Sequence, residues 1–304
     1  MKSKLFFVSF LLGGMGASAQ TDDLSAYAEP AFRSPLVAVE FTGQRCRYCP
    51  DLSRALKEKQ EKYGEENYII AALHNLEEYS KLPSSHVSLF NEECKKYAAS
   101  IEIHTGLPQL VYNTLGPAVS DHLLDDMFKE DDLMECTGNV WYNDNNEYVF
   151  DVNTRLRRNR LDFIKDKKID ILFWALENDI VALQDDNGKW TFPAHQHIFR
   201  GSINGTWGER FEIGSAYKKT WTVPSSVSVL DNSEVVAFFL DRETKTIYDA
   251  ARFKVSKLNV TGIEDENIAA PGKVGTTYDM SGREVQQPAA GGVYIKNGKK
   301  YILK

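Results

Sequence analysis

Residues 41–50 of the chain read Phe-Thr-Gly-Gln-Arg-Cys-Arg-Tyr-Cys-Pro, which sets Cys46 and Cys49 in a Cys-x-x-Cys spacing. The preceding segment, residues 35–41, is a proline followed by an apolar run rich in β-branched and aromatic residues, and this pattern predicts a buried strand. After the pair, apolar residues recur at helical spacing up to position 63, and Gly64 stands where a helix would end. The two cysteines are therefore expected at a strand-to-helix turn.

The chemistry of such a turn favours a reactive thiol. The first turn of a helix presents unpaired N–H groups and the positive end of the helix dipole, which together stabilise an anion such as a thiolate. At such positions the pKa of a cysteine falls from about 8.5 to roughly 3.5–7.5, and neighbouring cations lower it further. Arg45 and Arg47 flank Cys46 and supply that charge. We therefore expect Cys46 to attack and Cys49 to be the resolving thiol that releases a mixed disulfide.

A zinc half-site is the alternative interpretation of the pair. A structural zinc site needs a second Cys-x-x-Cys or two histidines at ligand spacing. The remaining cysteines, Cys94 and Cys136, are too scattered along the sequence to supply one. The spacing therefore favours redox chemistry, which requires no metal and no cofactor.

The chain begins with the pattern of a secretory signal peptide. Lys2 and Lys4 precede an apolar run at residues 5–12, and the small residues Ala-Ser-Ala at 17–19 form a cleavage site. No cysteine follows the run, so a lipoprotein anchor is not indicated, and the run is far shorter than the about 20 apolar residues of a membrane span. We expect cleavage after Ala19 and an exported soluble protein, in a compartment where disulfides persist.

Composition narrows the class of protein further. Four cysteines in 304 residues are too few for a disulfide scaffold, so the core must be hydrophobic, and a chain of this length can bury two cores. The formal net charge of −7 is modest and evenly spread, which argues against nucleic acid as a partner.

Further elements follow the cysteine pair. Residues 67–74 read as a second strand, which predicts a strand-helix-strand unit with parallel pairing. Residues 75–86 are polar and read as a loop, and residues 88–97 read as a helix. Residues 103–113 then hold Pro108 directly ahead of an apolar strand, an awkward position unless its peptide bond is cis.

Residues 36–50 and 106–112 together resemble the thioredoxin fold. The resemblance implies that Pro108 is the family's cis-proline, which lies against the Cys-x-x-Cys and, with Leu107, helps to bind extended substrate backbone. It also implies that Glu40 is the buried acidic residue that transfers a proton to the resolving cysteine.

The active turn departs from the usual thioredoxin pattern. Arg45 stands where thioredoxins usually have tryptophan, Arg47 and Tyr48 replace Gly-Pro, and Pro50 follows the second cysteine. Reduction potentials of Cys-x-x-Cys proteins span about −270 to −120 mV, so the direction of electron flow stays open.

Glu40 can also be interpreted from physical chemistry alone. A carboxylate inside an apolar strand is expensive to bury in its ionised form and tends to have a raised pKa, which suits a proton donor or acceptor beside a thiol. In the alternative, Glu40 points into solvent from an edge strand. Its place in the strand that enters the cysteine turn favours the functional role.

The other cysteines and two histidines are weaker candidates. Cys94 and Cys136 could form an inert disulfide or stay as two buried thiols, and an oxidising compartment favours the disulfide. His74 and His104 are interpreted as strand-end residues, because thiol exchange needs no histidine once the thiolate is stabilised.

Histidines and tryptophans also mark the second half of the chain. His195 and His197, if both lie on one strand, would face the same side and could bind a metal, but without a third ligand a structural or surface pair is favoured. The tryptophans are interpreted as the core or rim of a β-sandwich rather than as a sugar platform; they are Trp174, Trp190, Trp207 and Trp221.

A second region begins after a helix expected at residues 120–134. Short strands separated by turns, with no convincing helix between them, imply an all-β sandwich at residues 137–257. Its strands are expected at residues 140–142, 148–152, 169–176, 192–203, 217–223, 235–240 and 247–255.

Two short motifs carry a resemblance that spans both regions. Residues 40–43, Glu-Phe-Thr-Gly, precede the Cys-x-x-Cys-Pro, and residues 195–200 read His-Gln-His-Ile-Phe-Arg. From residue 35 to residue 257 the chain resembles the outer-membrane-protein-twenty-eight-related family. Members are envelope proteins of Gram-negative bacteria whose activity is poorly defined. The resemblance implies the architecture and a location at the outer membrane or cell surface, otherwise in the periplasm.

The end of the chain differs again. Residues 258–273 lack periodicity and read as a linker, and residues 274–304 read as short strands with a strong hairpin signal at residues 297–298, Asn-Gly. With Tyr-Asp-x-x-Gly-Arg, Gly-Val-Tyr and a basic end, this block resembles the C-terminal sorting domain of type IX secretion. That resemblance implies secretion machinery as a partner and fixation on the cell surface. The alternative is a small β-module packed on the sandwich.

The sequence thus predicts a signal peptide at 1–19, an α/β thioredoxin-like domain at 20–136, an all-β sandwich domain at 137–257, and, after the linker, a small C-terminal β module at 274–304.

Two functions remain open at this point. In the first, the protein exchanges thiols and disulfides with exported or surface proteins, with Cys46, Cys49 and Glu40 as catalytic residues and a redox partner protein that supplies or accepts electrons. In the second, it is a surface binding or adhesion protein in which the sandwich acts and the disulfide is only structural. An exposed Cys46 sulfur beside Pro108 would favour exchange, whereas a buried Cys46 with the sandwich docked over it would favour binding.

Overall fold

The computed structural model of the protein describes residues 27–28, 34–103, 106–116, 132–258, 277–279, 284–286, 293–296 and 299–302. The predicted signal peptide, His104, most of the helix expected at 120–134 and most of the linker expected at 258–273 lie outside these residues. The described chain is mostly β, with one large mixed sheet and few helices. Among the described helices, none is long and apolar enough to cross a membrane.

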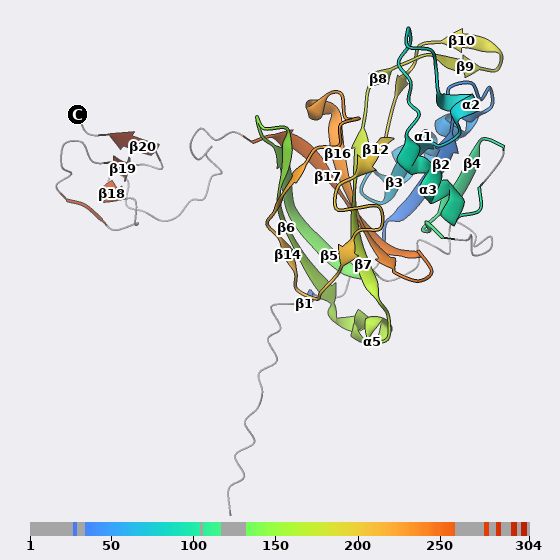
Figure 1. Cartoon of the computed structure of the whole chain (residues 1–304). Helices are drawn as coiled ribbons and strands as arrows, with labels where there is room; N and C mark the ends of the chain where they lie inside the picture. The colour runs from blue at the N-terminus through green and yellow to red at the C-terminus, as the bar shows by residue number, and fades with distance from the viewer. Residues whose placement is uncertain are drawn as a thin grey trace, which may run out of the picture.

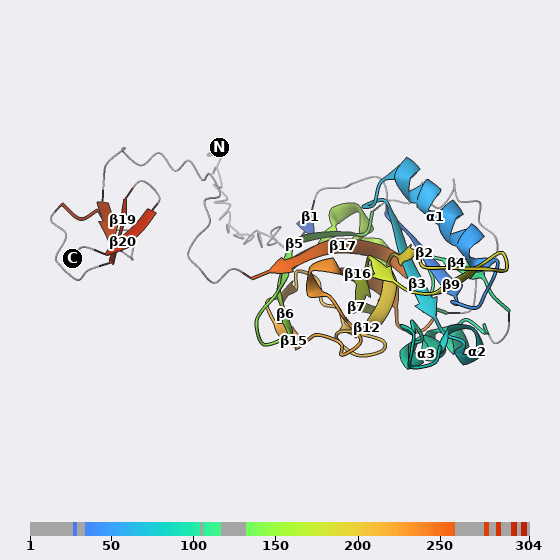
Figure 2. The ribbon, with the colours of Figure 1, turned by 90° about the horizontal axis from the view of Figure 1, so that it is seen from above.

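The cysteine turn belongs to a strand-helix-strand unit, as predicted. Strand β2 (Leu36–Thr42) leads into helix α1 (Cys49–Tyr63), and strand β3 (Tyr68–His74) returns parallel to β2. Strand β4 (Gln109–Tyr112) pairs antiparallel with the other edge of β2. Every residue of β2 and β3 is buried, because helices cover both faces of this part of the sheet (Figure 2).

The alternation of side chains along β2 decides which helix each residue meets. Leu36 and Ala38 point toward α1 and pack with its Leu56. Val37 and Val39 point the other way, into a core that includes residues of α3 (Glu92–Ser100). Figure 2 shows α1 on one face and α2 (Glu77–Ser80) with α3 on the other.

Two helices differ from the sequence prediction. The segment 75–86, expected to be a loop, contains the single turn of α2. The helix expected at 88–97 begins later, because the side chain of Asn91 accepts a hydrogen bond from the Glu93 N–H and so caps α3 from that position.

The remaining elements form the β region, which comprises residues 132–258. Its long strands are β5 (Met134–Tyr142), β6 (Glu147–Arg157), β7 (Ile169–Glu177), β12 (Ile198–Ser202), β16 (Ser233–Asp241) and β17 (Ile247–Lys257). The shorter elements are η2 (Arg158–Arg160), α5 (Leu161–Ile164), β8 (Ile180–Val181), β9 (Gln184–Asp186), β10 (Lys189–Thr191), β11 (Ala194–His195), β13 (Glu209–Arg210), β14 (Ala216–Tyr217), β15 (Thr220–Thr222) and η3 (Leu230–Asn232). An upstream strand, β1 (Tyr27–Ala28), pairs with β6.

A single sheet runs through both regions. Its strand order is β1-β6-β5-β17-β16-β7-β12-β3-β2-β4, so β12 joins the β region to β3 (Figure 1). The junction is short: Ile198 pairs in parallel with Ala72, whose N–H donates to the carbonyl of His197 at 2.8 Å. The sheet therefore has no free edge between the strand-helix-strand unit and the β region.

Two main hydrophobic cores fill the molecule. One lies between β2, β3, α3 and the middle strands of the β region, and it holds Tyr97, Trp174 and Phe199. The other lies inside the β region, where Phe150 of β6 and Phe173 of β7 meet with ring centroids 5.0 Å apart. The sheet thus curls so that β6 faces β7 across a core, and the two layers of the expected sandwich belong to one sheet.

The predicted pairing of Cys94 with Cys136 is wrong. Cys94 is buried on α3 in the first core, whereas Cys136 lies on β5 beside the second core, and both are free thiols. Burial raises the pKa of each thiol, so both are inert as nucleophiles at neutral pH. Composition alone suggests a pair here, but the two cysteines belong to different layers of the fold.

Three strands after residue 276 form a small antiparallel sheet. They are β18 (Thr277–Asp279), β19 (Val293–Lys296) and β20 (Lys299–Ile302). Strands β19 and β20 pair antiparallel up to Lys296 and Lys299, and the Asn-Gly signal at residues 297–298 lies outside the described part of the chain.

Candidate functional site

Cys46 and Cys49 form a disulfide at the end of β2 and the start of α1. Cys49 is the first residue of the helix, and its N–H donates to the carbonyl of Cys46 at 3.2 Å. The turn also needs Gly43, because a Cβ there would lie 2.7 Å from the Cβ of Tyr79 on α2. The sequence prediction of a strand-to-helix turn is confirmed.

The disulfide is buried. The exposed fraction is 4% for Cys46 and 1% for Cys49, whereas the neighbours Arg45 and Arg47 are exposed. A buried Cys46 is what we expect of a structural disulfide, whereas an exposed sulfur beside Pro108 would favour thiol exchange. The burial of Cys46 therefore favours a structural disulfide in this conformation.

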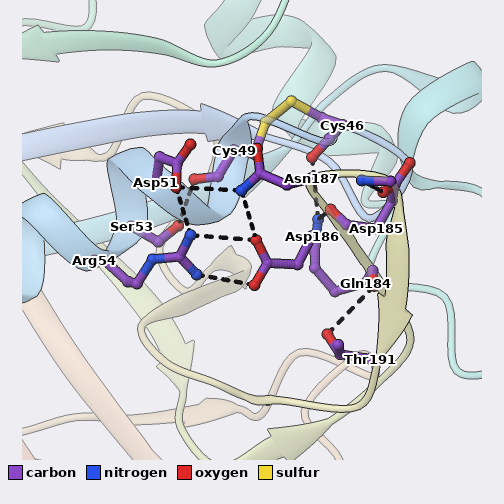
Figure 3. Close-up of polar contacts among 11 residues, drawn as sticks. Cys46, Cys49, Asp51, Ser53, Arg54, Gln184, Asp185, Asp186, Asn187 and Thr191 are labelled. Carbon is purple, nitrogen blue, oxygen red and sulfur yellow. Dashed lines mark hydrogen bonds and ion pairs between the residues drawn. A yellow bond between two sulfur atoms is a disulfide. The ribbon is translucent and has the colours of Figure 1, made fainter.

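A hairpin of the β region, formed by β9 and β10, covers the cysteine turn (Figure 3). The amide of Gln184 donates to the carbonyls of Gly43 and Cys46, both at 3.2 Å. Gln184 is itself 5% exposed, so these bonds are made away from solvent. Its side chain therefore fastens the turn from the side of the hairpin.

Backbone hydrogen bonds hold the same hairpin along the turn. The Asp185 N–H donates to the carbonyl of Gln44 at 2.8 Å, and the Asn187 N–H donates to that of Arg47 at 3.0 Å. In addition, the buried side chain of Gln44 donates to the carbonyl of Leu183 at 2.9 Å.

An ion pair joins the hairpin to the helix that follows the disulfide. Arg54 of α1 contacts Asp186 at 3.0 Å and also Asp51, one turn earlier, at 2.5 Å (Figure 3). These groups are largely exposed, so the pair adds at most about 1 kcal/mol to the contact. The buried bonds of Gln184 dominate the fastening.

Glu40 lies under the turn and is 2% exposed. Ser53 on α1 donates to its Oε1 at 2.8 Å, and the same hydroxyl lies 3.2 Å from the carbonyl oxygen of Cys49. Burial raises the pKa of Glu40 to about 7, although hydrogen bonds from Ser53 and Thr42 act in the lowering direction. Because β2 is paired on both edges, the alternative of a solvated Glu40 on an edge strand is wrong.

The Leu107–Pro108 peptide bond is cis, as the resemblance to thioredoxins implies. Gln109 pairs with Phe41, so Pro108 lies at the end of the sheet where β2 leads into the cysteine turn. Leu107 packs against the first core. A role for these two residues in binding substrate stays a prediction.

The histidines behave differently from one another. His74 is buried at the end of β3, whereas His197 bonds to Glu234 through Nδ1 at 2.7 Å and to Gln60 through Nε2 at 3.1 Å. His195 lies on β11, but His197 has a positive φ of 55° and leaves the strand, so the two do not share a strand face. Within the described residues, no group of three or more His, Cys, Asp or Glu could hold a metal ion.

The four tryptophans between residues 174 and 221 also differ in exposure. Trp174 is fully buried in the first core, Trp207 and Trp221 are partly buried, and Trp190 on the β9–β10 hairpin is half exposed. They do not form one platform, which agrees with their interpretation as core and rim residues.

The contact between hairpin and turn could not be found from the sequence, because it joins residues about 140 positions apart. A local signal exists only for the hairpin itself, since residues 185–188, Asp-Asp-Asn-Gly, are typical of a turn.

No family model matches the chain, and no curated protein matches it. Among solved structures the chain is similar to HBP35 of Porphyromonas gingivalis, with a TM-score of 0.54 and 14% sequence identity over 90% of this chain and 98% of that one. A domain of the outer membrane lipoprotein Omp28 from Porphyromonas gingivalis matches 42% of this chain and 92% of its own length, at 25% identity and a TM-score of 0.31. The likeness to HBP35 is one of fold, and it extends over most of both chains.

Proposed function

We propose that this protein exchanges thiols and disulfides with other exported proteins through Cys46 and Cys49. In its reduced form, the Cys46 thiolate attacks a substrate disulfide, forms a mixed disulfide and releases one substrate thiolate. Cys49 then attacks the Cys46 sulfur, which restores the Cys46–Cys49 disulfide and releases the second substrate thiolate. The substrate disulfide is reduced and the protein is oxidised; the reverse sequence oxidises a dithiol. A redox partner protein resets the pair, and no cofactor takes part.

Glu40 is the observation that carries this proposal. A carboxyl group with 2% exposure and no cation among its hydrogen-bond partners destabilises the fold when ionised, so a purely structural role does not account for it. Its pKa of about 7 suits a group that takes up and returns protons at neutral pH. Ser53 links it to the backbone of Cys49, which supports a role for Glu40 in accepting the proton of the resolving thiol.

The local fold supports the same chemistry. Cys46 precedes the N-terminus of α1, where helix N–H groups and the exposed Arg45 and Arg47 would stabilise its thiolate. The order β2-α1-β3 with β4 antiparallel and a cis Leu107–Pro108 bond fits a thioredoxin-like unit. In that unit, Pro108 and Leu107 would line the groove for substrate backbone.

The proposed location is the cell envelope, at the outer membrane or cell surface, otherwise the periplasm. It is supported by the signal-peptide pattern of residues 1–19 and by the resemblance of residues 35–257 to the outer-membrane-protein-twenty-eight-related family. The sheet β18-β19-β20 would belong to a sorting module recognised by the secretion machinery.

A surface binding protein with a structural disulfide is the second candidate. The 4% exposure of Cys46 and the hairpin fastened over it favour this function. For exchange to occur, the β9–β10 hairpin must move away from the turn.

The reduction potential of the pair separates the two functions, and the alkylation pKa of Cys46 adds a second measure. We expect a potential between about −270 and −120 mV and a thiol pKa below about 7.5 in the mature protein, with Cys46→Ser as the blank. A reduction potential below about −300 mV would mean that the disulfide is structural, and it would overturn thiol exchange in favour of the binding protein. The Glu40→Gln variant adds a direct check, because the reaction of Cys49 should lose its dependence on a group that titrates near pH 7.

A further inference from the structure

A cavity of about 790 Å³ lies between α1 and the β region. One wall is a single face of α1, on which Ser53, Arg54, Lys57 and Gln60 recur at intervals of one helical turn. The other walls come from β2 and β3, which contribute Glu40 and His74, and from β16, β17 and residues 193–198, and neither cysteine lines the cavity. Cavities of roughly 300–1,000 Å³ between two parts of a fold are typical of sites for small organic ligands.

Two histidines in this cavity, His74 buried and His195 half-buried, each have an unpaired ring nitrogen. His74 is 2% exposed and its Nδ1 has no hydrogen-bond partner among the described residues, and the same holds for Nε2 of His195. His195 bonds to the backbone of Ala182, so its free Nε2 is an acceptor. The ring centroids are 6.2 Å apart. A buried polar atom without a partner costs about 1–3 kcal/mol, which a bound polar molecule would recover.

The two rings stay neutral at neutral pH. Burial lowers the pKa of His74 well below its ordinary value and that of His195 to about 4. They therefore offer hydrogen bonds without charge, and amide side chains add to them elsewhere in the wall. The amides are those of Gln60, Asn178, Gln184, Gln196 and Asn232. Such a lining complements the N–H and C=O groups of peptide bonds.

Each wall also presents a lysine that is only weakly paired. Lys57 on α1 has Glu61 at 3.9 Å, and Lys254 on β17 has Glu65 at 3.5 Å; their side chains are 71% and 81% exposed. The arginines of the cavity differ, since each is held by two carboxylates. The lysines are therefore available to an incoming carboxylate.

Two acids of the lining have neutral partners instead of cations. Asp179 accepts a hydrogen bond from Gln196 at 2.8 Å, and Asp231 accepts one from Tyr142 at 2.6 Å. Neither carboxylate makes a salt bridge among the described residues, and Lys257 acts on Asp231 only through its charge, so both can attract an ammonium group. The cavity combines available cations, available anions and amide-like hydrogen-bonding groups.

We propose that this cavity binds a short peptide in its zwitterionic form. The peptide's carboxylate meets Lys57 and Lys254, its ammonium group lies on the side of Asp179 and Asp231, and its amide groups satisfy His74 and His195. The proposal goes beyond thiol exchange and does not depend on it, because neither cysteine lines the cavity, although Glu40 and Ser53 do.

The test is calorimetric titration of the mature, oxidised protein with trialanine and with trialanine amide, which lacks the carboxylate. We expect saturable 1:1 binding of trialanine and binding of the amide weaker by roughly tenfold, the loss of one charge-assisted contact. Absence of saturable binding of trialanine, or equal binding of both peptides, overturns the proposal.

Variants locate the peptide within the chain. Lys57→Gln and Lys254→Gln should each weaken trialanine several-fold and leave the amide unchanged, and His195→Phe should weaken both peptides. Lys59→Gln is the matched control, because Lys59 lies on α1 outside the cavity wall. If the affinity for trialanine is unchanged in Lys57→Gln and Lys254→Gln, or falls equally in Lys59→Gln, the peptide binds elsewhere and the assignment is overturned. Unchanged binding to Cys46→Ser would separate this result from the fate of the redox proposal.

Discussion

Two buried glutamates line the same cavity and differ in what surrounds them. Glu40 and Glu234 are each 2% exposed. Burial raises the pKa of Glu40 to about 7, with only hydroxyl groups as partners. Burial also acts to raise the pKa of Glu234, but hydrogen bonds and charges from His197 and Arg252 outweigh it and lower that pKa. At equal burial, Glu234 is thus an ionised structural carboxylate, whereas Glu40 is a carboxyl group that titrates near neutral pH.

The difference shows that a cation partner decides whether a buried glutamate is ionised. Glu234 is part of a chain of contacts from Glu65 through Arg252 to His197 that ties α1 to the β region. Glu40 has no such chain, and its nearest reactive neighbour is the helix start at Cys49. A buried acid that is left without a cation is a better functional candidate than one that is paired.

The largest expected effect comes from removing the cation of the paired site. Arg252→Met leaves Glu234 buried and short of a partner, so we expect the free energy of unfolding to fall by about 3–5 kcal/mol in a denaturant titration. Lys168→Met is the control, because its pair with Glu243 is exposed, and it should cost less than about 1 kcal/mol. Equal losses in the two variants would contradict the comparison.

The next effect concerns the unpaired site and depends on pH. Glu40 titrates near 7 in the folded chain and near 4.5 when unfolded, so the folded state holds the extra proton between these values. The wild type should therefore lose about 3 kcal/mol of unfolding free energy as the pH rises from 4.5 to 7. Glu40→Gln lacks this loss, so it should match the wild type near pH 4 and exceed it at pH 8. Parallel pH profiles would show that Glu40 is not the titrating group.

A smaller effect is expected where the hairpin fastens the turn beside Glu40. Gln184→Ala removes the side-chain hydrogen bonds to the carbonyls of Gly43 and Cys46, which keep only their backbone donors. It should lower the free energy of unfolding by about 1–3 kcal/mol, the net value of two hydrogen bonds. It should also speed the reduction of the disulfide by dithiothreitol, followed by thiol labelling. Thr191→Ala, which alters only a 3.4 Å contact within the same hairpin, should leave that rate unchanged. No change in the rate for Gln184→Ala would mean that the hairpin does not restrict access.

The smallest effect tests the hydroxyl between Glu40 and Cys49. The hydrogen bond from Ser53 lowers the pKa of Glu40, so Ser53→Ala should raise that pKa further, by the equivalent of about 1 kcal/mol or less. Carboxyl chemical shifts across a pH titration measure it directly. A pKa that stays or falls would show that burial alone sets the value.

Much of the strand-helix-strand unit could be predicted, because its signals are local. The apolar run before Cys46, the helical spacing after Cys49 and the proline ahead of β4 each act within a few residues. The burial of Glu40 could be predicted as well, because Glu40 lies within the same apolar run. These features fix the elements and their order, and the structure places them as expected.

The contacts that close the site could not be predicted in the same way. The bonds from Gln184 to the cysteine turn and the pairing of Ile198 with Ala72 join residues more than 120 positions apart, and no periodicity encodes them. The expected pairing of Cys94 with Cys136 failed for the same reason, since only the tertiary fold decides which thiols meet. The cavity exists only where these distant segments come together.

The joint between β12 and β3 has a practical consequence for anyone who wishes to produce part of this protein. Cutting the chain after the first region would remove β12 from β3 and expose the backbone of Ala72 beside an apolar surface. Such an edge recruits strands from other molecules, so the excised fragment is expected to aggregate. The smallest fragment suited to expression therefore extends through β17. A fragment that holds only the cysteine turn and its helix is expected to be prone to aggregation.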